Sequence, residues 1–173
     1  MKSIYGELNH KPHWYALYTR NRYEKKIENL LRQKKIETYL PLNTVYHKWS
    51  DRYKKITVPL FSCYIFVFIS LKERLTVLQT NGAIKLVTHG GIPAVIPEDQ
   101  INAIKILLDS QREVIPVDCF TPGKRVKIVR GLLCGLEGTL INKNNKNRFV
   151  MIIDGIMQGI SIQIDYHDLK IIA

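Results

Sequence analysis

The first third of the chain contains two patterns of apolar residues, one typical of a β-strand and one typical of an α-helix. Residues 13–19 (HWYALYT) form a short aromatic run, which is typical of a β-strand. In residues 23–35 (YEKKIENLLRQKK) apolar side chains recur every three or four positions, so they line one face of a predicted helix. Lysine and arginine crowd the other faces of that helix.

The middle of the chain returns to strand-like composition. Residues 37–49 and 53–61 flank a predicted turn at 50–52, and together they indicate a hairpin arm. Residues 63–69 (CYIFVFI) contain no polar gap, so both faces of this strand should be covered. We therefore expect residues 63–69 to lie in the centre of a sheet.

Two further helices are predicted before the pattern changes. A short helix over 71–80 stops at Asn81-Gly82, and a strand follows over 84–88. Pro97, Glu98 and Asp99 open another helix, because proline suits the first turn and carboxylates are favoured at a helix N-terminus. The order β-α-β-β-β-α-β-α fits a ferredoxin-like split βαβ domain with an added hairpin arm.

The last third contains only short strands separated by glycine and asparagine turns. The predicted strands cover 125–129, 137–142, 148–154 and 159–164, with turns at Gly131, Gly135 and Asn144-Asn145. So many short strands favour a small closed barrel, because closure removes exposed edges. The fold class is thus α+β. We expect a flexible lead at 1–12, a first domain at 13–109, a linker at 110–119 and a barrel domain at 120–173.

The net charge narrows the class of partner. Twenty-six lysines and arginines exceed fifteen acidic residues, giving +11 at pH 7, and most of this excess falls within residues 1–60. A basic surface of this kind favours nucleic acid or a nucleoprotein complex. No amphipathic anchor, signal peptide or long apolar run indicates a membrane, so we expect a cytoplasmic protein.

Enzymatic chemistry is not predicted. The cysteines at 63, 119 and 134 form no CxxC pair, the five histidines are scattered, and no nucleotide-binding or hydrolase motif appears. Cys134 and His167 could be imagined as a pair, but a buried structural cysteine is the favoured interpretation of Cys134. We expect no metal and no cofactor.

Four stretches, in order along the chain, resemble the NusG family of transcription elongation factors. They are WYALYT at 14–19 with the helix opened by YEKK at 23–26, PLFSCYIFV at 59–67, the segment 81–99 with NG, IKLV, GIPA and PED, and PGKRVKI at 122–128 with Gly131, Gly135, Glu137 and Gly138. The last stretch matches the KOW pattern, which implies an SH3-like β-barrel. Ser62-Cys63 stands where the family has Pro-Gly, which removes a turn-favouring pair and leaves the loop geometry open. The glycine-rich turn before the third helix is shortened to Gly90-Gly91.

Three more stretches resemble the specialised NusG paralogues called UpxY, with RfaH a more distant relative. They are YLPL at 39–42, WSDR at 49–52 and ERLTVLQT at 73–80. This resemblance implies antitermination on one long capsular polysaccharide operon of Bacteroides-type bacteria. The rival interpretations are a general NusG that couples polymerase to Rho or the ribosome, and a KOW-type RNA- or ribosome-binding protein without polymerase contact.

The resemblance also implies where partners bind. An apolar depression that receives the clamp of RNA polymerase would consist of Tyr18, Phe61, Tyr64 and Phe66, with Leu17 and Ile65 alternating into the core. An alternative, left open, is that these aromatic residues, Phe66 above all, are core.

Non-template DNA or leader RNA would be contacted by basic and amide side chains, with a merely solvated basic face as the alternative. These residues are Arg20, Asn21, Arg22, Lys26, Arg74 and Asn81. The arm carries further cations that could touch upstream duplex DNA: Lys48, Arg52, Lys54 and Lys55. In the barrel, Ile156 and Met157 are expected to be exposed apolar anchors for Rho or a ribosomal protein, or else a plain hairpin turn.

Overall fold

The computed structural model describes most of the chain as two compact units, Met1–Glu98 and Asp99–Ala173. The described residues are 8–49, 52–110, 112–118, 123–143 and 146–172. The predicted turns at 50–51 and 144–145, together with Cys119 and Phe120, lie outside them. Residues 8–10 are helical and Leu8 is buried, so this part of the expected flexible lead is wrong.

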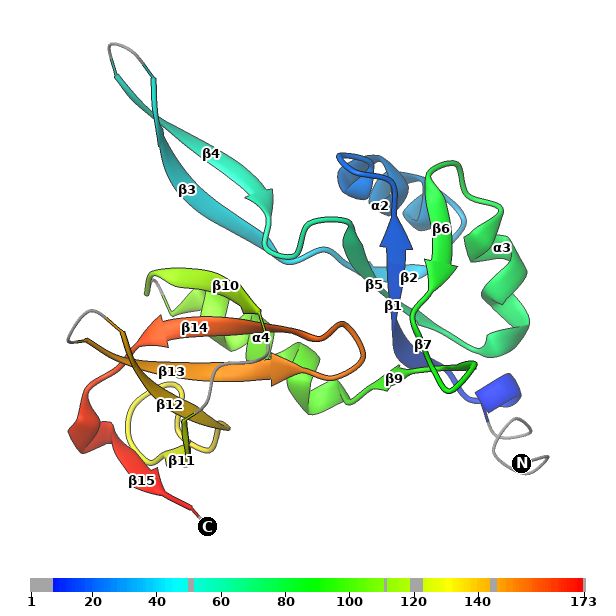
Figure 1. Cartoon of the computed structure of the whole chain (residues 1–173). Helices are drawn as coiled ribbons and strands as arrows, with labels where there is room; N and C mark the ends of the chain where they lie inside the picture. The colour runs from blue at the N-terminus through cyan, green and yellow to red at the C-terminus, as the bar shows by residue number, and fades with distance from the viewer. Residues whose placement is uncertain (1–7, 50–51, 111, 119–122, 144–145, 173) are drawn as a thin grey trace. The chain divides into compact units, whose positions relative to one another are not determined.

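The first unit is built on an antiparallel sheet whose strands run in the order β2-β5-β1-β6, with β9 also pairing β1 (Figure 1). Its strands are β1 (His13–Thr19), β2 (Glu37–Tyr39), β5 (Tyr64–Ile69), β6 (Ala83–Leu86) and β9 (Val95–Ile96). A small hairpin of β7 (Thr88–His89) and β8 (Ile92–Pro93) follows β6. β5 lies between β2 and β1, which confirms the prediction of a central strand over 63–69.

Helices cover one face of this sheet. They are α2 (Glu24–Gln33), the 3-10 turn η1 (Leu71–Glu73) and α3 (Arg74–Leu78). Ile27 and Leu31 of α2 and Val77 of α3 are fully buried against alternate residues of β1 and β5, because successive strand side chains point to opposite faces. This layer is the core of the unit, and the helical face predicted from the spacing of residues 23–35 is the one buried.

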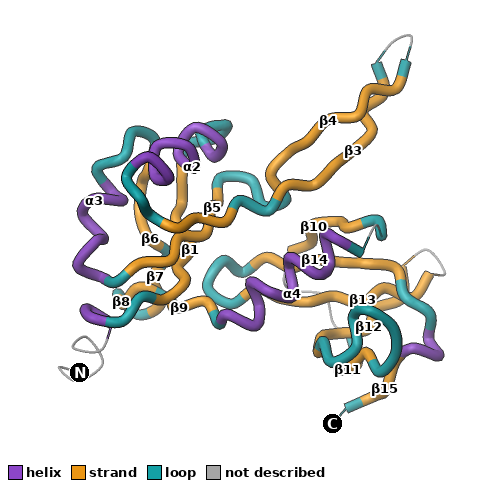
Figure 2. Tube along the Cα trace, turned by 180° about the vertical axis from the view of Figure 1, so that it is seen from behind, coloured by secondary structure: helices purple, strands orange, loops and turns teal. Residues whose placement is uncertain are grey.

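The hairpin arm consists of β3 (Leu42–Lys48) and β4 (Tyr53–Pro59), which pair only with each other among the described residues. Figures 1 and 2 show the arm extending away from the sheet as a separate twisted ribbon. Its base is fastened at two points: the Leu60 amide donates to the Pro41 carbonyl at 2.8 Å, and Lys25 Nζ donates to the Thr57 carbonyl at 2.9 Å. The arm is therefore anchored to α2 near its root.

The second unit contains α4 (Glu98–Asp109) and a six-stranded antiparallel sheet in the order β10-β14-β13-β12-β11-β15. The elements are β10 (Val114–Asp118), β11 (Lys124–Ile128), β12 (Glu137–Lys143), β13 (Lys146–Ile153), β14 (Gln158–Gln163), η2 (Tyr166–Asp168) and β15 (Leu169–Ile171). Four of these strands match the predicted ones within two residues. The segment expected to be a linker instead contains β10, which pairs with β14.

The division into units separates α4 from the sheet of the first unit, whereas sequence reasoning placed this helix in the first domain. Gln100 and Asp154 fasten α4 to the second unit through two hydrogen bonds. Gln100 Nε2 donates to the Asp154 carboxylate at 2.8 Å, and the Asp154 amide donates to Gln100 Oε1 at 2.9 Å. Together the two units make the α+β fold predicted from the sequence. In the described part of the chain, no helix is long and apolar enough to cross a membrane.

Candidate functional site

The sheet of the first unit carries aromatic side chains on the face opposite its helices. The register pairs Tyr18 with Tyr64 across β1 and β5, and their ring centroids lie 5.3 Å apart. Leu17 and Ile65 are fully buried in the helical layer, which confirms that they alternate with the tyrosines. The sequence therefore placed these two tyrosines on the correct face of the strands.

Exposure differs among the four residues predicted to contact polymerase. Tyr18 and Tyr64 are half-buried, whereas Phe61 and Phe66 are buried. The Phe66 ring lies 6.2 Å from Phe61, edge to face, and 6.3 Å from Tyr39. In this structure Phe61 and Phe66 thus support the surface from beneath, as the core interpretation held for Phe66, and only the two tyrosines are accessible.

Sequence reasoning missed another part of this face. The Trp14 and Phe68 rings lie 5.2 Å apart in a tilted arrangement, one register step beyond Phe66 along the same two strands. The signal was present, because residues 14, 16 and 18 alternate with the core in β1, and 64, 66 and 68 do so in β5. Lys85 was also missed; it lies opposite Tyr18 in β6 and is exposed.

A left-handed turn at Cys63 places Tyr64 at the end of β5. Cys63 has φ +66, a conformation that favours glycine and costs other residues about 1–2 kcal/mol. Its amide donates to Glu24 Oε1 of α2 at 2.7 Å, and its carbonyl accepts from the Thr19 amide at 2.9 Å. Glu24 and Thr19 are both buried. A carboxylate from the helix thereby holds the turn at Ser62-Cys63, whose geometry the sequence alone left open.

The surroundings of Tyr64 disfavour ionisation. Burial raises the pKa of the Tyr64 hydroxyl, and the neighbouring Tyr18 and Cys63 add to the increase. Burial likewise raises the pKa of the Cys63 thiol, with the Glu24 carboxylate adding to it. Both groups are therefore protonated at neutral pH, and the surface offers neutral rings with hydroxyl tips rather than charge.

The structure brings together most of the basic residues predicted at the strand–helix junction. The Arg20 amide donates to the Gly82 carbonyl at 2.9 Å, so the turn of Arg20, Asn21 and Arg22 lies against the Asn81-Gly82 turn. A Cβ at Gly82 would lie 2.4 Å from the Tyr23 ring, and Gly82 has φ +97, so only glycine allows this approach.

The remaining members of the predicted set are dispersed. Lys26 lies over the Tyr23 ring at 5.3 Å, which places it beside the turn. Arg74 is exposed on α3 and makes no hydrogen bond or ion pair with the turn among the described residues. The predicted cations of the arm are all exposed: Lys48, Arg52, Lys54 and Lys55. The junction and the arm are thus two separate basic surfaces.

The two residues predicted to be exposed apolar anchors in the second unit, Ile156 and Met157, differ in exposure. Met157 is 60% exposed and has φ +55, at the tip of the β13–β14 turn. Ile156 is buried, so its predicted exposure is wrong; the turn directs this side chain inward. Leu132, which the sequence did not single out, is more exposed than Met157. Cys134 is exposed, so the interpretation of a buried structural cysteine is also wrong.

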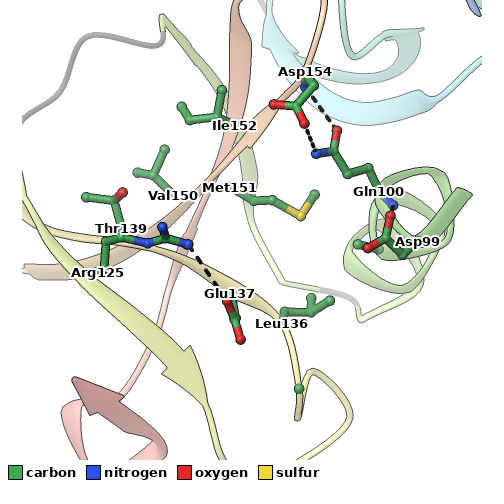
Figure 3. A pocket seen from close by; sticks show the side chains of 13 residues that line it. Asp99, Gln100, Arg125, Leu136, Glu137, Thr139, Val150, Met151, Ile152 and Asp154 are labelled. Atoms are coloured by element: carbon green, nitrogen blue, oxygen red, sulfur yellow. Dashed lines mark hydrogen bonds and ion pairs between the residues drawn. The ribbon is translucent and has the colours of Figure 1, made fainter. Parts of the chain in front are cut away.

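A hollow of about 660 Å³ lies within the second unit between α4 and strands β12 and β13 (Figure 3). Two pairs of its polar side chains contact each other: Gln100 with Asp154, and Arg125 with Glu137 at 3.8 Å. Among the described residues no cluster of histidine, cysteine and carboxylate side chains could hold a metal. The hydrogen bonds between Gln100 and Asp154 therefore join α4 to the end of β13 at this hollow.

Comparison with known proteins identifies the family. The family described as "Transcription termination factor nusG" matches residues 12–105, more than half of the chain. The chain belongs to the NusG family. The match begins just before β1 and extends into α4, so the aromatic face and the basic turn both lie inside the family's shared region.

Solved structures agree at the level of fold. A structure described as "Domain interaction in Thermotoga maritima NusG" is 19% identical with a TM-score of 0.56, and the match covers 94% of this chain and 98% of that one. Two structures of an MjSpt4:Spt5 complex, conformations A and B, are each 14% identical, with TM-scores of 0.33 and 0.34. They cover 92% of this chain and 98% and 97% of theirs. The first likeness shows that both units follow the NusG arrangement of a mixed α/β domain and a β-rich domain.

Proposed function

We propose that this NusG-family protein is an elongation and antitermination factor that binds RNA polymerase through the aromatic face of its first unit. The observation that supports this role is the Tyr18–Tyr64 pair: two half-exposed rings, 5.3 Å apart, on neighbouring central strands. Rigid aromatic side chains dominate protein interfaces, because each buries a large area and loses little side-chain entropy on binding. Phe61 and Phe66 beneath them keep the surface firm.

The basic turn beside this face would contact nucleic acid held by the polymerase. Arg20 and Arg22 supply phosphate attraction, and Asn21 or Asn81 supplies amide groups for an exposed base. A factor that binds both the clamp and the nucleic acid favours the closed, elongating state of polymerase. The paused state is then less populated, because a ligand shifts an equilibrium toward the state that it binds better.

Action on one long operon, as in the UpxY paralogues, is our preferred range of targets. It rests on the stretches at 39–42, 49–52 and 73–80. RNA sequencing with and without the protein tests this range. A change confined to one long operon supports the specialised role, and a change spread across the genome supports a general NusG.

Replacement of Tyr64 tests the polymerase contact. Tyr64→Ala should reduce capture of RNA polymerase in a pull-down by at least ~30-fold, since interface hot spots of this type cost 2 kcal/mol or more. Tyr166→Ala is a matched control, because Tyr166 is an exposed tyrosine in the second unit. Thermal unfolding establishes that Tyr64→Ala still folds. Capture of wild-type amounts of polymerase by a folded Tyr64→Ala variant contradicts the proposal.

A second partner is favoured by one observation in the second unit. Met157 is an exposed apolar side chain held at positive φ, and strain of this kind is concentrated at functional sites. Rho or a ribosomal protein would dock there if the protein acts as a general NusG. Binding of either by the second unit, and its loss in Met157→Ser, would favour that alternative over the specialised role.

A further inference from the structure

The hairpin arm exposes aromatic side chains that its fold does not need. Tyr46 is 71% exposed and Tyr53 is 68% exposed. An isolated two-stranded ribbon is marginally stable, and burying its aromatic rings against a neighbour would strengthen it. The arm instead leaves both rings exposed to solvent, and its ribbon extends away from the sheet (Figures 1 and 2).

The register places both tyrosines on one face of the ribbon. Tyr46 lies opposite Lys55, and Tyr53 lies opposite Lys48, and directly opposed residues share a face. The four side chains therefore form a checkerboard in which each ring has a lysine across the ladder and another lysine two positions along its own strand. The reverse face is different, because it pairs Val45 with Ile56, both half-buried.

The register makes Tyr46 and Tyr53 diagonal neighbours across the ladder. The backbones of such neighbours lie about 7–8 Å apart, close to twice the ~3.4 Å spacing of stacked bases. Their rings make no contact with any other ring among the described residues, whereas Trp49 at the end of β3 is already covered by Lys54 at 5.8 Å. One flat base can therefore lie between the two tyrosine rings.

The charge of the arm selects the same ligand. Residues 42–59 contain one acidic residue, Asp51, and four basic residues: Lys48, Arg52, Lys54 and Lys55. None of the four forms an ion pair with another described residue. Lys48 and Lys55, which alternate with the exposed rings on this face, match a polyanion whose flat groups are accessible.

We propose that the Tyr46–Tyr53 face of the arm binds single-stranded nucleic acid, with an unpaired base stacked on the tyrosines and the flanking phosphates held by Lys48 and Lys55. The phosphates of a duplex could contact the lysines, but the faces of its bases are stacked on one another, so neither tyrosine ring would contact a base. A lipid surface needs a continuous apolar face, whereas this one alternates with charge. This role deepens the proposed function, on which it rests for its setting, by naming the form of nucleic acid that the arm contacts.

Binding of the full-length protein to a labelled oligothymidylate of ~10 nucleotides, a usual length for such sites, tests the stacking. The variant Tyr46→Thr with Tyr53→Thr removes both rings and keeps β-branched side chains that suit a strand. Its affinity should fall by at least ~10-fold, since a stacked base contributes on the order of tenfold or more. The slope of affinity against salt should stay unchanged, because both lysines remain.

Two further variants separate the rings from the charge. Tyr46→Phe with Tyr53→Phe keeps the rings and should bind the oligothymidylate as wild type does. Lys48→Gln with Lys55→Gln should lower the magnitude of the salt slope by about 1.4 for single strands and by about 1.8 for duplexes. The control Tyr166→Thr removes an exposed tyrosine outside the arm and should change nothing.

Clear results overturn the assignment. It fails if the threonine variant binds the single strand as tightly as wild type, if it loses duplex binding equally, or if the phenylalanine variant also loses binding. An oligouridylate should bind within about threefold of the oligothymidylate, because rings and phosphates need no 2′-hydroxyl; RNA binding without DNA binding also overturns it. The polymerase pull-down separates the two roles, since the threonine variant should still capture polymerase and Tyr64→Ala should still bind the oligothymidylate.

Discussion

Two pairs of tyrosines in the first unit invite comparison: Tyr18 with Tyr64 on the sheet, and Tyr46 with Tyr53 on the arm. The sheet pair is half-buried, with rings in contact and phenylalanines beneath. The arm pair is mostly exposed, on a ribbon that contacts α2 near its root. The sheet pair thus forms a firm surface suited to contact with another protein. The arm pair forms exposed platforms suited to a flat ligand that binds between the rings.

The difference lies in what fixes the rings. Cys63 and Glu24 lock the strand end that carries Tyr64, and this contact joins α2 to β5. Among the described residues no carboxylate holds the arm beside its tyrosines in this way, and Lys25 contacts the arm at Thr57. Changes in the core of the first unit should therefore alter the sheet pair and leave the arm pair intact.

The largest expected effect comes from Glu24→Ala. It leaves the Cys63 amide without its carboxylate partner, and hydrogen bonds to charged groups contribute about 1.5–3 kcal/mol. The free energy of unfolding should fall by about 2 kcal/mol, and polymerase capture should fall with it. Chemical denaturation measures the first quantity and a pull-down the second.

The same Glu24→Ala protein should bind oligothymidylate as wild type does, because the arm does not depend on this turn. Glu24→Gln, which keeps an acceptor oxygen, is the matched control and should lose less stability. Equal damage to both binding activities would show that the two pairs are not independent.

A smaller effect is expected from Tyr15→Phe, on the helical face of β1. Tyr15 is fully buried, and its hydroxyl has no hydrogen-bond partner among the described residues. Removing an unpaired buried hydroxyl should stabilise the fold by about 1 kcal/mol. Denaturation at neutral pH measures this gain, and neither binding activity should change, since Tyr15 touches neither surface.

Alkaline pH gives Tyr15→Phe a second signature. Burial raises the pKa of Tyr15 from 10.0 to about 12. Between these values the unfolded chain ionises and the folded protein does not, so wild-type stability should fall as pH rises from 10 toward 12. The slope is at most about 1.4 kcal/mol per pH unit. The variant should lose this contribution to the slope; an unchanged slope would show that Tyr15 does not titrate in this way.

The smallest effect is expected from Cys63→Gly. Glycine relieves a left-handed conformation that costs about 1–2 kcal/mol, but it loses more entropy on folding, by about 0.5–1 kcal/mol. A net gain of about 0.5 kcal/mol should appear in denaturation. Polymerase capture should stay at wild-type levels, because the Tyr64 backbone keeps its place. Cys63→Ala keeps the strain and should show no gain.

Most of the fold was readable because its signals are local. The aromatic run at 13–19, the helical spacing after Tyr23 and the ungapped strand over 63–69 each specify one element. The strand Val114–Asp118 was missed because its proline and charges are typical of a linker, and it gains its place only by pairing with β14. The grouping of α4 with the second unit was missed for the same reason, since its hydrogen bonds reach Asp154.

The candidate site shows the same limit. Alternation predicted which face Tyr18 and Tyr64 occupy, but it could not tell how deeply Phe61 and Phe66 lie on that face. Arg20 and Asn81 lie far apart in the sequence, and the hydrogen bond between Arg20 and Gly82 brings them together in the fold. Ile156 and Met157 are neighbours in sequence, and only the geometry of the turn sends one inward and the other out.

The hydrogen bond from Cys63 to Glu24 also bears on how relatives of this chain diverge. A glycine in the strand-entry motif makes its turn unaided, whereas Cys63 depends on a carboxylate thirty-nine positions away. Because the Glu24 carboxylate holds this turn, we expect related sequences that lack glycine at position 63 to carry an acid at position 24. A search that insists on Pro-Gly at the turn would overlook such members.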